Sequence, residues 1–207
     1  DNTDSLVYGM LAADLNGNGI DELIVAQQSK LSVFIDGDRD EQADEPGINS
    51  GYGLAAADLF GSDRNELVVT DGSGNAYILG LSGTSLTTYQ EWNTEQVMNT
   101  GAGVAISLTH DNPWIVHGGD AGILMAWEVT SSSSHALAWD STSDNNGGST
   151  LYSLPGGNTR GIGAGNIDSD PAIEILVGSG ARRVYAFDGI THAVDWVSPV
   201  LDELPMG

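Results

Sequence analysis

The chain carries four copies of one sequence unit, and this internal repeat limits its fold more than any other feature. The copies align without gaps and occupy residues 9–36, 53–80, 101–128 and 161–188. A repeat that returns every ~40–60 residues indicates that one supersecondary unit is built several times along the chain. Such a unit cannot bury its apolar face alone, so neighbouring units must pack against one another.

Each copy predicts three β-strands separated by turns. A strand of small residues, Leu11–Leu15 in the first copy, leads into a polar loop. A continuous aliphatic run follows, which is typical of a strand covered on both faces. After a Gly/Ser turn comes a segment in which apolar and polar residues alternate. The aliphatic runs are Leu23–Val25, Leu67–Val69, Ile115–Val116 and Ile175–Val177, and the alternating segments are Leu31–Ile35, Ala76–Leu79, Ile123–Trp127 and Val184–Phe187.

A fourth strand is predicted after three of the copies, each time with a tryptophan (Trp92, Trp139 and Trp196). The first copy lacks such a strand and runs into an acidic insert, residues 36–47. Four strands every ~40–50 residues are the pattern of a β-propeller blade. The predicted fold is all-β, a β-propeller with four blade-like repeats of about four antiparallel strands. The chain is expected to be a single propeller domain or segment, with blades at approximately residues 6–48, 49–98, 99–150 and 151–207.

Two alternatives to a complete four-blade propeller stay open. A β-sandwich would require the similarity between the copies to be accidental. A segment of a larger propeller would be completed by further blades or by association with a second chain, because propellers commonly have 4–8 blades.

Charge and composition exclude several classes of partner. The chain has 29 acidic and 6 basic side chains and a formal charge of -23. A surface this acidic does not neutralise phosphates, so no nucleic acid and no anionic lipid are expected as partners. The absence of cysteine excludes disulfides and thiolate metal sites. No apolar stretch reaches ~18 residues, so no membrane insertion is expected. No signal peptide precedes Asp1, so we expect a cytosolic chain, a processed one, or one cut from a longer protein.

The loop after the first strand of the first copy has the pattern of a calcium site. It runs from Asp14 to Glu22, with oxygen-bearing side chains at alternating positions and glycines that permit a tight turn. Ca²⁺ takes six to eight oxygen ligands, including carbonyls and bidentate carboxylates. An EF-hand would need its glutamate at position 12, which here is Val25. The expected ligands are the side chains of Asp14, Asn16, Asn18 and Glu22 and the carbonyl of Ile20.

The corresponding loops of the other copies predict one further site. The fourth copy offers Asn166, Asp168, Asp170 and Glu174, with Ala172 at the carbonyl position. In the second copy, Asp58 to Glu66, a phenylalanine and Arg64 intrude, and weak or no binding is expected. The third copy has lost the ligands. The acidic insert, Asp36 to Asp44, is a further candidate. Metal-free Asx turns are the alternative throughout, although converging carboxylates repel unless a cation lies among them.

These loops resemble the calcium loops of FG-GAP (VCBS-like) repeats, which form integrin α-chain-type propeller blades and occur in many secreted proteins. Tyr8-Gly9 and Tyr52-Gly53 are similar to the start of that repeat. The segment 184–196 also resembles the outer strands of PQQ-type propeller repeats, in which a tryptophan docks neighbouring blades. The resemblance implies one to two structural calcium ions, lying away from the face that binds ligands, and an extracellular or cell-surface location.

An enzyme is the less favoured interpretation. The chain lacks the common nucleophile, zinc and phosphate-loop motifs. His117 replaces a valine of the other copies and is expected in the core; His110, His135 and His192 are the remaining histidines. A polysaccharide lyase would need a basic residue near its substrate, for which the candidates are Arg160, Arg182 and Arg183.

The function expected from the sequence is therefore a secreted or cell-surface, calcium-stabilised binding or adhesion module for a glycan or a surface protein. Trp114 and Trp127 are candidates for stacking on sugars, with core packing the favoured role. The alternatives are a polysaccharide-degrading enzyme, either a lyase or a glycosidase, and a structural segment of a larger surface assembly that self-associates.

Overall fold

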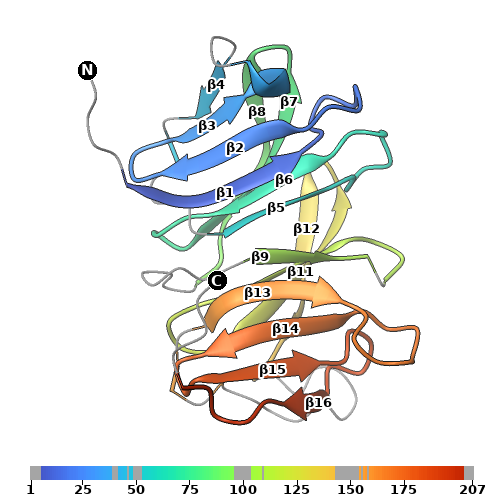
Figure 1. Cartoon of the computed structure of the whole chain (residues 1–207). Helices are drawn as coiled ribbons and strands as arrows, with labels where there is room; N and C mark the ends of the chain where they lie inside the picture. The colour runs from blue at the N-terminus through green and yellow to red at the C-terminus, as the bar shows by residue number, and fades with distance from the viewer. Residues whose placement is uncertain are drawn as a thin grey trace. The chain divides into compact units, whose positions relative to one another are not determined.

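The computed structural model describes residues 6–38, 42–45, 47–48, 53–95, 104–108, 110–142, 154, 156–157 and 159–202. The described residues form four separate four-stranded antiparallel sheets, in each of which every strand pairs with the next one along the chain (Figure 1). One short 3₁₀ turn, η1 (Ile35–Gly37), is the only helical segment among them. The predicted all-β fold with four propeller-type blades is confirmed.

The four sheets follow the four sequence copies, and each lies within one of the expected blade ranges. The first contains β1 (Val7–Ala13), β2 (Glu22–Gln27), β3 (Leu31–Phe34) and β4 (Gln42–Glu45). The second contains β5 (Gly53–Ala57), β6 (Glu66–Thr70), β7 (Asn75–Ser82) and β8 (Ser85–Asn93). The third contains β9 (Val104–Ser107), β10 (Trp114–Gly118), β11 (Leu124–Ser131) and β12 (Ser134–Asp140). The fourth contains β13 (Thr159–Gly165), β14 (Glu174–Ser179), β15 (Arg183–Phe187) and β16 (Val194–Val197).

The first sheet corrects one expectation from the sequence. Its fourth strand, β4, lies inside the acidic insert and pairs with β3 from Phe34↔Gln42 to Leu31↔Glu45. The insert therefore replaces the tryptophan-containing strand of the other copies with a strand of polar and acidic residues. Strand pairing uses main-chain groups alone, and charged residues are common on edge strands because they discourage pairing with other chains.

The chain divides into two compact units, Asp1–Glu95 and Gln96–Gly207, and each unit contains two sheets. Within the first unit β1 lies near β5 and β4 near β8, and within the second β9 lies near β13. Corresponding strands of consecutive sheets are thus neighbours, as consecutive repeats require. The assignment of all four blades to a single domain stays a prediction.

Each unit has its own apolar core, built from the aliphatic second strands and the alternating third strands. In the first unit the core includes Ile24, Leu31, Leu67 and Leu79, all fully buried. In the second it includes Val116, Ile175 and the rings of Trp139 and Phe187. Burial of such side chains contributes roughly 1.5–3 kcal/mol each relative to exposure. These cores hold the turns at the strand ends in place.

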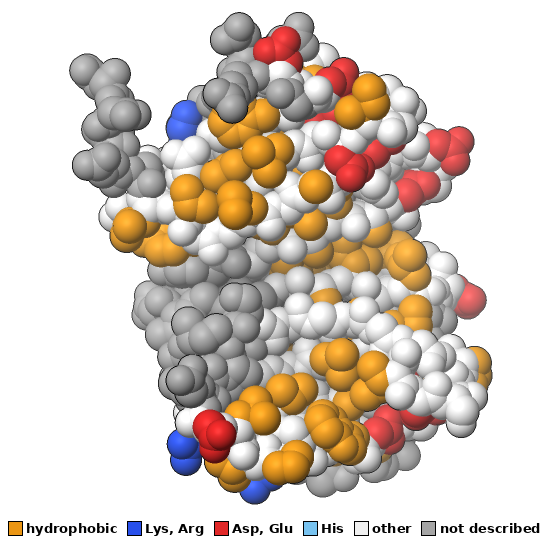
Figure 2. Space-filling view, in the orientation of Figure 1, with side chains coloured by type: hydrophobic (Ala, Val, Ile, Leu, Met, Phe, Trp, Pro, Cys, Tyr) orange, Lys and Arg blue, Asp and Glu red, His pale blue; other side chains and the backbone are white. Residues whose placement is uncertain are grey.

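The outside of the first sheet combines an apolar face with acidic loops. Figure 2 shows apolar side chains over β1 and β2, where Val7, Met10 and Leu23 are exposed, and acidic side chains on the loops of this unit. No helix among the described residues has the length and hydropathy needed to cross a membrane.

Candidate metal centre

The corresponding loops of the four sequence copies occupy one structural position, the hairpin between the first and second strands of each sheet. In three of the hairpins the second strand begins with a buried glutamate: Glu22, Glu66 or Glu174. Each of these carboxylates accepts the backbone N–H of the second loop residue, from Leu15 at 2.7 Å, Leu59 at 2.8 Å and Ile167 at 2.6 Å. The glutamate therefore closes the loop in each of these three sheets.

In the first hairpin the ligands expected from the sequence are bonded largely to the loop itself. The Asp14 carboxylate accepts backbone N–H groups from Gly17 at 2.7 Å, Asn18 at 3.1 Å and Gly19 at 2.7 Å. These bonds, that of Gly19 above all, hold the pKa of Asp14 below its ordinary value. Gly17 and Gly19 have φ values of +77° and +84°, which glycine adopts without strain. The turn is thereby curled around Asp14.

The two asparagines of this hairpin act as donors toward carboxylates. The Nδ2 of Asn16 donates to the Oε1 of Glu22 at 2.7 Å, and the Nδ2 of Asn18 donates to Asp36 at 2.8 Å. The side-chain bonds from Asn18 and then Asn16 lower the pKa of Asp36, whereas burial raises that of Glu22. Asp36 follows β3, outside the loop, and it is a member of this site that the loop pattern did not indicate.

The fourth hairpin brings its carboxylates together instead. Ligand oxygens of Asp168, Asp170 and Glu174 all lie within 4.8 Å of one another, and no other group of three acidic or histidine side chains in the described part of the chain is as close. Glu174 is fully buried; its Oε2 accepts the Ile167 N–H, while its Oε1 has no hydrogen-bond partner among the described residues. A buried carboxylate oxygen without a donor is costly unless a cation satisfies it.

The remaining expected ligands of the fourth hairpin shape the loop. The Nδ2 of Asn166 donates to the carbonyl oxygen of Asp170 at 2.7 Å. The backbone N–H of Ala172 donates to the Asp170 carboxylate at 2.7 Å, and that of Asp170 donates to Asp168 at 2.8 Å. In the first hairpin Ile20 similarly donates its N–H to Asn18 at 2.7 Å. Cation binding by these residues stays a prediction.

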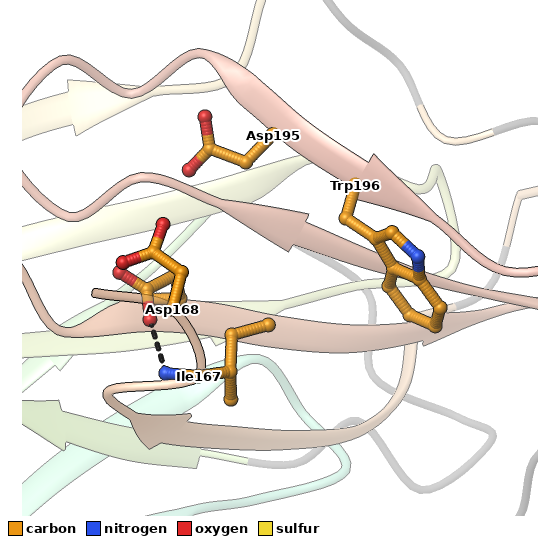
Figure 3. A pocket seen from close by; sticks show the side chains of 5 residues that line it. Ile167, Asp168, Asp195 and Trp196 are labelled. Atoms are coloured by element: carbon orange, nitrogen blue, oxygen red, sulfur yellow. Dashed lines mark hydrogen bonds between the residues drawn. The ribbon is translucent and has the colours of Figure 1, made fainter. Parts of the chain in front are cut away.

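A fourth carboxylate faces this cluster from another strand. Asp195, on β16, lines a pocket together with Ile167, Asp168, Glu174 and Trp196. Figure 3 shows the Asp195 carboxylate directed toward Asp168. Burial first, and then the negative charges of Asp188, Asp168, Asp170 and Glu174, raise the pKa of Asp195. Asp195 lies outside the loop pattern of the sequence, because its proximity to the loop depends on the pairing of β16.

The second hairpin has the loop shape without the convergent charge. The Asp58 carboxylate accepts the backbone N–H groups of Ser62 at 2.9 Å and Asp63 at 3.1 Å. Phe60, at a position where the first copy has an asparagine, packs edge-on against Tyr89 with ring centroids 5.7 Å apart. This hairpin is stabilised by backbone donors and aromatic packing.

The third hairpin has an aromatic stack in place of carboxylates. His110 stacks on Trp114 with ring centroids 3.7 Å apart, and His192 from the fourth sheet stacks on Trp114 at 5.3 Å and on Trp139 at 4.8 Å. Burial, followed by the charge of His110, lowers the pKa of His192 to about 4. His192 is therefore neutral near pH 7, and the ring stack joins the third and fourth sheets.

The other candidates from the sequence have structural roles. His117 is fully buried, accepts the indole N–H of Trp127 at 2.9 Å, and has its pKa lowered to about 4 by burial. Trp114 is buried, so the core role favoured for it holds. Arg182 and Arg183 donate to the backbone carbonyl oxygens of Asp202 and Ser198. The side chain of Arg160 and part of the acidic insert, residues 39–41, lie outside the described residues.

Comparison with known proteins supports the fold. No protein-family model matches the sequence, and no curated protein matches it. Among solved structures, the chain is similar to BBS1N in complex with ARL6DN soaked with mercury: TM-score 0.65, 12% identity, 99% of this chain and 57% of that chain. The same complex soaked with lead gives a TM-score of 0.63 at 12% identity over 98% and 57%.

BamB from Moraxella catarrhalis is also similar, with a TM-score of 0.55 and 15% identity over 96% of this chain and 48% of that chain. Identities this low show the β-propeller fold alone. The chain spans about half the length of these neighbours.

Proposed function

We propose that this chain is a calcium-stabilised propeller module of the FG-GAP (VCBS-like) type that binds a glycan or a surface protein outside the cell or at its surface. The observation that carries the proposal is the cluster of Asp168, Asp170 and Glu174, with a buried glutamate oxygen that lacks a donor. A divalent cation at this point would neutralise the repulsion and satisfy that oxygen.

The donor set favours calcium over other divalent ions. The clustered ligands are carboxylate oxygens on a hairpin, with no imidazole in the group. Hard oxygen ligands suit Ca²⁺ and Mg²⁺, and Ca²⁺ tolerates the irregular geometry and higher ligand number that a loop with neighbouring carbonyls provides. Zinc would prefer nitrogen or sulfur ligands.

The binding role is supported by the fold and the charge. A propeller presents the loops at its strand ends as a broad surface, and such loops commonly carry recognition. BBS1N, a structural neighbour, was crystallised in complex with ARL6DN. For this chain, the strong negative charge argues against phosphate-rich partners and in favour of glycans or proteins with basic or neutral surfaces.

Calcium titration of the full 207-residue chain by isothermal calorimetry tests the proposal. We expect one or two sites in the wild type and loss of one site in the double variant Asp168→Asn/Asp170→Asn. A glycan array and a panel of surface-protein ectodomains, each probed in calcium and in chelator, test the binding role. Absence of calcium binding at millimolar concentration would overturn the calcium assignment, and absence of any binder would overturn the adhesion role.

A further inference from the structure

The pocket beside the fourth hairpin combines an acidic side with an apolar side. Its volume is about 330 Å³, and its described lining residues are Ile167, Asp168, Glu174, Asp195 and Trp196 (Figure 3). Volumes of ~300 Å³ and above are typical of small-ligand sites. Ile167 and Trp196 are 51% and 47% exposed, so their apolar surfaces are open to a ligand.

A bulge in β16 places Asp195 and Trp196 on the same pocket. In a regular strand, successive side chains point to opposite faces of the sheet. Here Phe187 pairs with Val194 and Ala186 pairs with Trp196, which leaves Asp195 as an extra residue in the strand. A bulge of this kind redirects side chains. The strand therefore presents a carboxylate and an indole ring to one pocket.

The exposure of Trp196 is specific to the fourth sheet. Trp139 occupies the equivalent register position in the third sheet, opposite Ala126, and is 2% exposed within the core. The residue before it, Ala138, stands where the fourth sheet has Asp195. The third sheet thus uses this tryptophan for packing, whereas the fourth leaves it available beside a group of carboxylates.

The cation at this site would retain positions for a ligand. The hairpin contributes Asp168, Asp170 and Glu174, and Asp195 faces them across the pocket. Ca²⁺ takes six to eight oxygens, so positions on the open side of the pocket remain for water or ligand hydroxyls. Three carboxylates around one divalent ion, with that of Asp195 across the pocket, keep a net negative charge, which disfavours uronates and other anionic sugars.

We propose that a calcium ion bound by Asp168, Asp170 and Glu174, with Asp195 across the pocket, coordinates two adjacent hydroxyl groups of a neutral sugar whose ring stacks on Trp196. This inference rests on the proposed function and names its ligand class: neutral glycans with a free vicinal diol. Stacking on an indole supplies apolar contact area with little loss of side-chain entropy.

Two pairs of variants of the full chain test the site. Trp196→Ala removes the stacking ring, and Val200→Ala truncates another exposed apolar side chain outside the described lining. Asp195→Asn removes one carboxylate charge at the pocket, and Asp202→Asn makes the same change outside it. The probes are calcium alone, measured by calorimetry, and the methyl glycosides of mannose, fucose, galactose and galacturonic acid, measured by saturation-transfer NMR in calcium and in chelator.

We expect at least one neutral glycoside to bind in calcium only, and galacturonate to bind more weakly than its neutral counterpart. Trp196→Ala should weaken glycoside binding by about tenfold or more with calcium affinity unchanged. Asp195→Asn should weaken calcium binding by about threefold, because it removes one negative charge near the ion. The two control variants should behave as wild type.

The failures of this inference and of the proposed function are distinguishable. Calcium binding with no glycoside bound, or glycoside binding indifferent to chelator or to Trp196→Ala, overturns the sugar site and leaves the calcium module standing. Calcium affinity unchanged in Asp195→Asn would show that this carboxylate does not act on the ion, and likewise overturns the inference. No calcium binding by the wild type overturns both.

Discussion

The first and fourth hairpins share one loop pattern and satisfy it in different ways. In the first, Asn16 and Asn18 donate hydrogen bonds to Glu22 and Asp36, so donors within the loop satisfy these two carboxylates. In the fourth, Asp168 and Asp170 stand at the corresponding positions and cannot donate when ionised. Glu174 accordingly keeps an oxygen without a partner.

This difference shows that agreement with a ligand pattern and need for a cation are separate properties. The first loop matches the calcium pattern more closely, with glycines where its turn requires positive φ. The fourth loop has Ser169 and Pro171 at those positions, and proline cannot adopt positive φ. Yet the fourth loop concentrates negative charge, and we expect it to depend more strongly on a bound ion.

Removal of calcium should give the largest effect. At free calcium 100–1,000 times the dissociation constant, binding to the native state adds about 3–4 kcal/mol to the free energy of unfolding. Thermal melts of the full chain in calcium and in chelator should differ accordingly. Most of the difference should survive Asp14→Asn and be lost in Asp168→Asn/Asp170→Asn. Loss of the difference in Asp14→Asn, with the difference kept in the double variant, would contradict the stronger calcium dependence of the fourth hairpin.

Folding stability at low pH depends on a buried histidine in the third sheet, His117, which is not part of the calcium loops. Its pKa falls from 6.5 to about 4 in the folded protein, so the unfolded chain binds the proton first as pH decreases. The stability contributed by neutral His117 is complete above pH 6.5 and is lost between pH 6.5 and 4, to a total of about 3 kcal/mol.

His117→Val restores the residue of the other three copies and should remove that loss. Denaturant unfolding at pH 7 and pH 4.5 measures it, with wild type and variant compared in chelator. The variant should gain stability relative to wild type as the pH falls. A stability difference that does not change with pH would contradict a neutral buried histidine.

Asn16→Asp should make the first hairpin resemble the fourth. The substitution removes the donor to the Glu22 Oε1 and adds a negative charge, so unfolding in chelator should require about 1–2 kcal/mol less free energy. In calcium the loss should be smaller, since the new carboxylate is a ligand. Equal destabilisation in both buffers, measured by urea denaturation, would show that this loop does not bind the ion.

Asp168→Asn should produce the smallest effect and one of opposite sign. An asparagine oxygen can still accept the Asp170 N–H, while one charge of the cluster is removed. In chelator and low salt the variant should be more stable than wild type by roughly 0.5 kcal/mol, because like-charge repulsion at an exposed site is weak and screened. A decrease in stability without calcium would show that the three carboxylates do not repel strongly enough to require a cation.

Much of the fold follows from local sequence. The aliphatic and alternating segments became the second and third strands of each sheet, because side-chain periodicity reports directly on burial. The fourth strand of the first sheet was missed because β4 is polar, and main-chain pairing leaves no apolar pattern to detect. Trp196 is exposed on β16, and its docking of a neighbouring blade stays a prediction.

The candidate site, like the fold, was predicted from the sequence only in part. The sequence alone determined four hairpins at equivalent positions, three of them ending at a glutamate, because strand order and loop length are local properties. Only the tertiary structure decided which further carboxylates approach these loops: Asp36 reaches the first hairpin from the end of β3, and Asp195 reaches the fourth from a bulge in β16. Convergence of charge depends on strand register across the sheet, which no single loop encodes.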